Sequence, residues 1–390
     1  MSNTNINTTI YFDNAATTAV RDEAFEAMVP YLREAYGNPS SLYKIAREAK
    51  NAIEKSREQV AAAIGASPSE IFFTGSGTEA INWALLSSSF SNMSKGNHII
   101  TSNIEHHAVL HSCKYLSKCG FDVTYLPVDE FGIVCVEELK RAIRPETILI
   151  SIMYANNEIG TIQPIAEIGA IARERGIIFH TDAVQAIGSL PVDVKLDNID
   201  LLALSAHKLH GPKGVGALYI RSGVNTPAFI HGGAQERGRR AGTENVAGIV
   251  ALGEAIRLAH IEMDEKVKKV RKIRDRIVTE ILDKVPNAQL NGHPEKRLPG
   301  NASISFDFVE GESILLMLDM KGIAASSGSA CTSGALNPSH VLMALGLPHE
   351  KAHGSVRISV GKYNTEEDAD KLIEAIVPIV EKLRSMSPLC

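Results

Sequence analysis

The chain has 390 residues, of which 44% are hydrophobic and 22% charged. This is the composition of an ordinary globular protein, and the length allows two domains with a sizeable core. The net charge of −5 gives no electrostatic reason to expect a nucleic acid or an anionic membrane as a partner. No apolar run is long enough to span a bilayer, and the N-terminal residues resemble neither a secretory signal nor a transit peptide. We therefore expect a cytoplasmic protein.

Five cysteines are spread along the chain without any CxxC pair: Cys113, Cys119, Cys135, Cys331 and Cys390. A zinc ribbon or a thioredoxin-like site is therefore not expected, and we expect no metal site. In a reducing compartment these thiols stay free.

At the N-terminus, a short apolar strand precedes a segment rich in turn and capping residues, Asp13–Thr18. Helical spacing follows over residues 19–35, and an amphipathic helix runs from the loop at 37–41 to about Ile64. We interpret the charges of this helix as a solvated face; they are Arg47, Glu48, Lys50, Glu54, Lys55, Arg57 and Glu58.

A short apolar strand at 70–74 ends in a glycine-rich turn that contains Gly77 and Thr78 and leads into a helical pattern. Backbone amides at a helix N-terminus bind phosphate well, although a glycine-rich turn is also an ordinary strand-to-helix connection. Three later apolar stretches also end in polar side chains: His106 after 98–101, Asn157 after 148–153 and Asp182 after 177–181. A lone histidine is more often structural, and paired asparagines can form a simple turn. A buried carboxylate at Asp182, however, needs a cationic partner.

The segment Leu201–Gly216 carries an apolar strand directly into Ser205, His207 and Lys208, before a turn rich in glycine and proline. Open α/β sheets bind ligands at such strand ends. A partly desolvated amine there has a lowered pKa and becomes a nucleophile towards a carbonyl, whereas the alternative is a surface lysine. We expect Lys208 to form a Schiff base.

Strands and helices alternate from about 70 to 220, which predicts a mostly parallel sheet covered by helices. The helix 165–175 is expected to end at Gly176. A long helical region at 245–284 is expected to lead into a second domain with a strand at 301–308 and helices at 311–321 and 365–385.

Cys331 lies in a loop of small residues at 324–335, where no bulky side chain can cover it. An exposed thiol is open to oxidation, so a reactive cysteine is a better interpretation than a tolerated surface thiol. Arg357 falls in a short strand pattern, where it is either a surface residue or a bidentate clamp for a carboxylate.

Taken in order, these motifs resemble the cysteine desulfurases of the NifS/IscS type, a class-V family of fold-type I aminotransferases that depend on pyridoxal 5'-phosphate. The specific motifs are SerAlaHisLys at 205–208, HisThrAspAlaValGln at 180–185, GluArgGlyxArgxGlyThr at 236–243 and SerSerGlySerAlaCysThrSer at 326–333. The resemblance implies a large domain, 16–262, with a mostly parallel seven-stranded sheet. It also implies a smaller α+β domain, made of 1–15 and 263–390, that carries the cysteine loop.

The resemblance also implies a role for each site residue. Lys208 matches the Schiff-base lysine, Asp182 the partner of the pyridine nitrogen, and His106 the imidazole stacked on the ring, with a suggested role in proton transfer. Gln185 and Asn157 match residues near the phenolic oxygen, and Arg357 the clamp for the substrate carboxylate. The residues that match phosphate ligands are Gly77, Thr78, Ser205, His207 and, from a second subunit, Thr243. Cys331 matches the nucleophile that receives sulfur.

The implied reaction converts L-cysteine to L-alanine, with sulfur held on Cys331 as a persulfide and then passed to an acceptor or iron–sulfur scaffold protein. The implied assembly is a homodimer. Alternatives are a selenocysteine lyase, another aminotransferase-like enzyme, or a non-catalytic scaffold for sulfur transfer. Tyr43 and Ala46 depart from the usual His and Gly of the family. The short tail ending at Cys390 favours a NifS-like member, and the acceptor stays open between nitrogenase maturation, general cluster assembly and tRNA thiolation.

Overall fold

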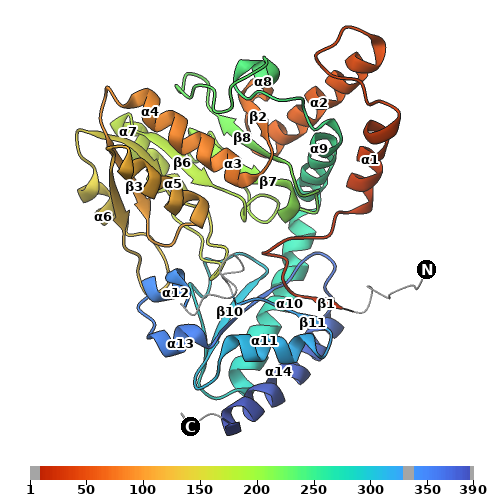
Figure 1. The fold of residues 1–390 in the computed structure, drawn as a ribbon. Coiled ribbons are helices and arrows are strands. Elements are labelled where there is room, and N and C mark those ends of the chain that lie inside the picture. Colours follow the sequence, from red (N-terminus) through yellow and green to blue (C-terminus); the bar gives the residue numbers. More distant parts are fainter. Residues whose placement is uncertain (1–8, 328–337, 387–390) are drawn as a thin grey trace.

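The computed structural model describes residues 9–327 and 338–386. In this part of the chain, seven strands form one sheet in the order β2-β8-β7-β6-β5-β3-β4, with β8 antiparallel to its neighbours (Figure 1). The strands are β2 (Ile71–Thr74), β3 (His98–Ser102), β4 (Asp122–Leu126), β5 (Thr147–Ser151), β6 (Ile178–Asp182), β7 (Leu201–Ser205) and β8 (Gly216–Ile220). The prediction of an α/β fold with a mostly parallel sheet is confirmed.

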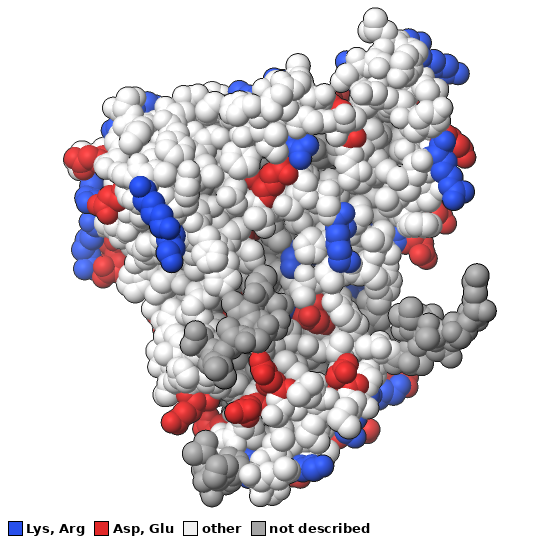
Figure 2. Space-filling view, viewed as in Figure 1, with Lys and Arg blue, Asp and Glu red and all other residues white. Residues whose placement is uncertain are grey.

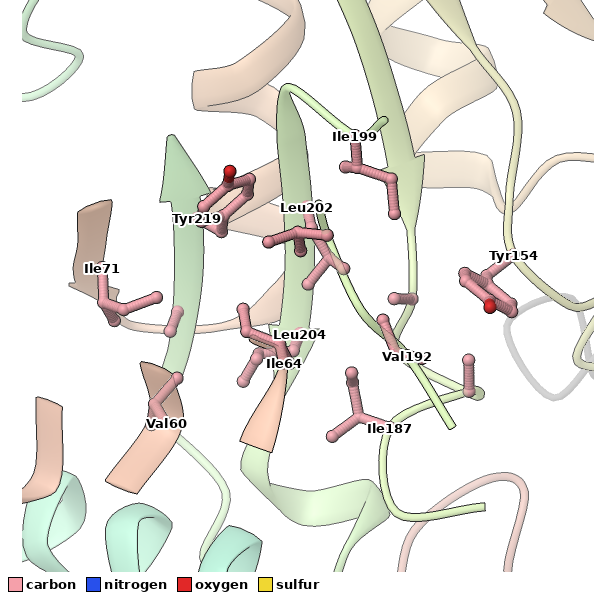
Figure 3. Close-up of a cluster of buried hydrophobic side chains, with 14 of the residues drawn as sticks. Val60, Ile64, Ile71, Tyr154, Ile187, Val192, Ile199, Leu202, Leu204 and Tyr219 are labelled. Carbon is pink, nitrogen blue, oxygen red and sulfur yellow. The ribbon is translucent and has the colours of Figure 1, made fainter. Parts of the chain in front are cut away.

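Helices cover both faces of this sheet because neighbouring residues of a strand point to opposite sides. On one face, Val60 of α2 and Ile64, the residue directly after α2, pack with Leu202 and Leu204 of β7 and with Tyr219 of β8 (Figure 3). On the other face, Trp83, Val109 and Leu116 pack with residues that include Leu201 and Leu218. The helices of this part are α1 (Asp22–Arg33), α2 (Lys44–Ala63), α3 (Gly77–Asn82), α4 (Ser88–Asn92), α5 (His107–Lys118), α6 (Val136–Ala142), α7 (Ile165–Arg175), α8 (Gln235–Gly238) and α9 (Val246–Ile261).

A second hydrophobic core forms around a smaller antiparallel sheet of order β12-β10-β9 in the described part of the chain. Its elements are α10 (Met263–Lys284), β9 (Ala288–Leu290), β10 (Asn301–Phe306), α11 (Gly311–Asp319), β12 (Ser355–Ser359) and α14 (Glu366–Met386). Phe12 is buried in this core, next to β1 (Ile10–Tyr11), which pairs with β11 (Ile323–Ala324). The short helices α12 (His340–Ala344) and α13 (His349–His353) lie beside it (Figure 1). A domain boundary at residue 262 stays a proposal.

Two expected elements end differently in the structure. The region 245–284 forms two helices, interrupted at Glu262. The carboxylate of Glu262 binds Arg21 at 2.9 Å and Lys362 at 2.8 Å, so contacts with two distant segments coincide with the break.

The strand expected at 301–308 ends at Phe306, and Phe308 has a φ of 69° that no strand accommodates. Gly176 ends α7 in the left-handed conformation, as expected.

The interpretation of Arg57 as part of a solvated face is wrong. Its side chain is buried and forms a bidentate ion pair with Glu236, at 2.8 and 2.9 Å. Other charges on the outer face of α2, such as Lys50 and Glu58, are exposed as expected.

The thiols of Cys113, Cys119 and Cys135 are free, and Cys331 and Cys390 lie outside the described residues. Within 9–327 and 338–386, no helix combines the length and apolarity needed to cross a membrane. Among these residues, no cluster of three or more His, Cys, Asp or Glu side chains is placed to hold a metal ion.

Candidate active site

A cavity of about 290 Å³ opens at the carboxyl edge of the large sheet, and it brings together ten of the residues selected from sequence. They are Gly77, Thr78, His106, Asn157, Asp182, Gln185, Ser205, His207, Lys208 and Arg357. Parallel strands explain this convergence, because β3, β5, β6 and β7 all end at the same edge. Asp182 pairs with Ala203 of the neighbouring strand, which places its carboxylate near the segment that carries Lys208.

Lys208 lies half-buried in a single helical turn, Ala206–Lys208, directly after β7. Its Nζ donates to the carbonyl oxygens of Ala15 and Ala16, each at 2.6 Å. The turn-rich segment after β1 is distant from Lys208 in the sequence. In the fold its carbonyl groups orient the amine towards the cavity.

Asp182 is buried at the end of β6, and its Oδ1 accepts a hydrogen bond from the backbone N–H of Val184 at 2.9 Å. Burial raises the pKa of this carboxyl group, while His106, the Val184 N–H and Lys208 act in the opposite direction. A buried carboxylate with a raised pKa is stabilised by a cation brought into the same cavity.

The turn before α3 leaves no room for a side chain at Gly77. A Cβ there would lie 2.9 Å from Val184 Cγ2 and 3.3 Å from Ser205 Cβ. The turn is fixed by Ser76, whose Oγ accepts from the Glu79 N–H at 3.1 Å. Backbone amides and the hydroxyl of Thr78 therefore border the cavity at close range, as a cradle for an anion requires.

His207 lines the same cavity as Gly77 and Thr78. Burial, with Lys208 and Lys213 nearby, lowers its pKa to about 4, so the ring is neutral at pH 7. Its Nδ1 lies 3.2 Å from Thr17 Oγ1.

Arg357 reaches the cavity from β12 of the small sheet and is buried. Its guanidinium binds the Asp13 carboxylate at 2.7 Å and donates to the Asn157 carbonyl at 3.1 Å. Gln185 donates to the Ala15 carbonyl at 3.0 Å. The arginine is therefore not a surface residue, and its position between the two sheets suits a clamp for an anionic group.

His106 is the residue immediately before α5, and its Nδ1 accepts a hydrogen bond from the backbone N–H of Ala108 at 3.1 Å. Burial lowers the pKa of the imidazole; Asp182 and Glu158 oppose this effect, while Lys208 and His340 add to it. The ring is therefore neutral at pH 7.

Sequence reasoning missed four titratable cavity residues, Glu105, His107, Glu158 and His340. Glu105 is buried, and burial raises its pKa to about 8. An acidic residue three positions after the end of an apolar strand is the signal that could have identified it. Two selected residues stand apart: Thr243 is exposed and does not line the cavity, and Cys331 lies outside the described residues.

An amine, a buried carboxylate and an anion cradle at the crevice of an α/β sheet define the class of pyridoxal-phosphate enzymes of fold type I. The model of the family "Aminotransferase class-V" matches residues 10–372. The chain belongs to this family and, within it, to the cysteine desulfurases of the NifS/IscS type.

Individual relatives agree with this placement. The chain is 59% identical to the cysteine desulfurase IscS of Methanosarcina thermophila, over 98% of this chain and 95% of the relative. It resembles the solved structure of a NifS-like protein with a TM-score of 0.91 and 43% identity, over 96% of this chain and all of that one. A structure described as SspA in complex with cysteine has a TM-score of 0.81 and 38% identity, over 92% and 100% of the two chains.

The residues of the cavity fit pyridoxal 5'-phosphate, on which this family depends. The cradle at Gly77 admits an anion but no Cβ, and the raised pKa of Asp182 creates a place for a protonated ring nitrogen. Lys208 supplies the primary amine that the cofactor's carbonyl requires. On the face in Figure 2, basic and acidic side chains are interspersed over the upper part, whereas acidic side chains predominate over the lower left.

Proposed function

We propose that this cysteine desulfurase converts L-cysteine to L-alanine in the described cavity and passes the sulfur to Cys331. The proposal is carried by one observation: Lys208, Asp182 and Arg357, from three separate elements, line the same cavity. Bound pyridoxal phosphate supplies a carbonyl that condenses with the substrate amine and a ring that takes up the electron pair released at Cα.

The chain's own residues divide the remaining tasks. With the cofactor bound, Gly77, Thr78, Ser205 and His207 would hold the phosphate, and Asp182 would keep the ring nitrogen protonated. Gln185 and Asn157 would bind near the phenolic oxygen. Arg357 orients the substrate carboxylate, and Lys208 removes the proton from Cα once its amine is free.

In the sulfur step, the Cys331 thiolate attacks the substrate sulfur. An S–S bond forms and the Cβ–S bond breaks, and the electron pair of the broken bond passes to the substrate carbon. That carbon takes up a proton, and alanine leaves. Cys331 then holds a persulfide whose outer sulfur goes to an acceptor, which we propose is an iron–sulfur scaffold protein in the cytoplasm.

We also propose that two copies form the enzyme, with Thr243 completing the phosphate site of the partner copy. Thr243 is exposed on its own subunit. Apolar side chains are unusually exposed on α1 and the loop after it: Phe25, Leu32, Tyr36, Leu42 and Tyr43 are each 54–89% exposed. A second copy would cover such a surface, and sedimentation of the purified chain tests this directly.

Product analysis tests the reaction. The purified protein is incubated with L-cysteine and a reductant, and alanine and sulfide are quantified. Equal amounts are expected, with loss of both in Lys208→Ala. Cys331→Ala separates the alternatives, because an aminotransferase-like enzyme or a selenocysteine lyase that does not use this thiol keeps its turnover.

A further inference from the structure

The motif at 236–243 contributes no residue to the lining of the described cavity, and of its residues only Thr243 has a proposed role in cofactor binding. Glu236 and Arg237 have φ values of 45° and 59°, in the left-handed region that residues other than glycine seldom adopt. Such a conformation persists where the surrounding contacts hold it in place. The contacts of this segment therefore indicate what it does.

The segment that begins with Glu236 covers the outer edge of β2, the edge strand of the large sheet in the described part of the chain. An uncovered edge strand leaves backbone groups without partners. Here the Phe73 N–H donates to the Glu236 carboxylate at 2.9 Å. The Ile71 carbonyl accepts from Arg237 at 3.2 Å and from Arg57 at 2.8 Å. Side chains thus replace a neighbouring strand and fix β2, which leads directly into the turn before α3.

Arg240, at the end of the same segment, holds that turn through Glu79. Its Nε donates to Glu79 Oε1 at 2.8 Å and its Nη2 donates to Oε2 at 3.2 Å, so the guanidinium binds both carboxylate oxygens. Glu79 Oε2 also accepts from the Gly75 N–H at 2.9 Å, and the Glu79 N–H donates to Ser76 Oγ at 3.1 Å. Arg240 therefore orients a carboxylate that is hydrogen-bonded to the backbone of the turn.

The ion pair of Arg240 with Glu79 also sets the charge beside the anion cradle. Glu79 directly follows Thr78, whose side chain borders the cavity. An unpaired carboxylate at this position would oppose the binding of a phosphate, because the two groups carry the same charge. The side chains of Glu79 and Arg240 are only 17% and 22% exposed, so solvent screens their charges less than at the open surface. The hydrogen bonds to Glu79 raise the pKa of Arg240, which keeps the guanidinium charged.

We propose that Arg240 is a positioning residue for the cofactor phosphate, because it fixes the turn before α3 through Glu79 and neutralises a carboxylate that would otherwise repel the phosphate. This inference rests on the proposed function, in which that turn holds the phosphate. It gives the motif at 236–240 a role in cofactor binding although the motif does not line the cavity.

Cofactor affinity in charge variants tests the proposal. The holoenzyme is dialysed to equilibrium against graded concentrations of pyridoxal phosphate, and visible absorbance measures the fraction bound. We expect Arg240→Met to bind the cofactor at least about 10-fold more weakly than the wild type, and Arg240→Lys, which keeps the charge, about 3-fold more weakly. The double variant Arg240→Met/Glu79→Gln should regain at least about 5-fold over Arg240→Met, because no unpaired charge is left. Wild-type affinity in Arg240→Met, or a double variant no better than Arg240→Met, would overturn the proposal.

Phosphorus NMR of the same proteins separates repulsion from a loss of hydrogen bonds. The second pKa of a phosphate monoester is about 6. In the wild type we expect the bound phosphate to stay dianionic, with a constant signal from about pH 6.5 to about 8.5. In Arg240→Met the unpaired Glu79 carboxylate should raise the pKa of the phosphate, so that its signal titrates in this range. The added Glu79→Gln should abolish the titration. A titration that persists in the double variant would show that repulsion by Glu79 is not its cause, and the proposal would be wrong.

Arg257→Met is the matched control. Arg257 also binds both oxygens of a carboxylate, that of Glu254, at 2.9 and 2.6 Å, but on α9. We expect this variant to keep the cofactor affinity and the phosphorus signal of the wild type; losses equal to those of Arg240→Met would overturn the proposal. Failure of the proposed function would appear separately, as a wild-type holoenzyme that binds pyridoxal phosphate but forms no alanine from L-cysteine.

Discussion

The ion pair between Arg57 and Glu236 gives the sharpest stability prediction. Both side chains are buried, at 3% and 6% exposure. Besides two bonds from Arg57, the Glu236 carboxylate accepts one from the Phe73 N–H at 2.9 Å. Glu236→Gln preserves the shape but leaves the buried guanidinium with only the exposed carboxylate of Glu54, at 3.3 Å, as a counter-charge. Removing one partner of a buried pair costs about 3–5 kcal/mol. Since Gln keeps one acceptor oxygen, we expect a loss of about 3 kcal/mol.

Urea unfolding of the cofactor-free protein at pH 7 measures this loss, as a shift in midpoint at constant slope. Glu367→Gln is the matched control, because Glu367 pairs with Lys371 at a similar distance, 2.8 Å, but both are exposed. An exposed pair contributes less than about 1 kcal/mol. The double variant Arg57→Met/Glu236→Gln should recover part of the loss, since it buries no unpaired charge. Equal effects of Glu236→Gln and Glu367→Gln would refute the reasoning.

Three further outcomes are expected. The variant Gly77→Ala should lose pyridoxal phosphate on dialysis at least about 10-fold more readily, because the added Cβ would lie 2.9 Å from Val184 Cγ2. Visible absorbance measures the cofactor that is retained. Unchanged retention would contradict the proposal that this turn binds the phosphate. Glu105 has a raised pKa of about 8, so wild-type stability should fall by about 1.4 kcal/mol per pH unit between its unfolded value and pH 8. Glu105→Gln should remove this slope in urea melts at about pH 5 and about pH 7.5, and an unchanged slope would show that another group causes it. Thr243→Ala should weaken cofactor retention without changing the sedimentation of the dimer; full retention would place Thr243 outside the phosphate site.

Much of the fold could be predicted because its signals are local. Apolar runs that alternate with amphipathic helices predict a mostly parallel sheet, and polar residues directly after those runs fall at its carboxyl edge. The positions of Asp182 and Lys208 at this edge could therefore be predicted from the sequence, since each lies at the end of its own strand pattern.

Residues whose environment depends on contacts with distant parts of the chain could not be predicted from the sequence. Arg57 looks solvated because Glu54, its helical neighbour, offers a surface ion pair, whereas its buried partner Glu236 lies on a different element. The sequence around the helix break at Glu262 contains no glycine or proline that would predict it. The ion pairs of Glu262 with Arg21 and Lys362 join segments that are distant in the sequence. His340 lies far along the chain from the other cavity residues of the large sheet, and in the fold its Nε2 lies 3.1 Å from the Glu105 carbonyl oxygen.

The most direct test of the account measures where the sulfur goes. The holoenzyme is mixed with L-cysteine without reductant, and alanine is quantified beside the masses of all cysteine-containing peptides. We predict one alanine per active site in the first turnover and one added sulfur atom on the Cys331 peptide, with neither Cys113 nor Cys135 modified. Cys331→Ser should carry no sulfur at all. Alanine formed with sulfur on another cysteine, or undiminished alanine formation by Cys331→Ser, would contradict the account.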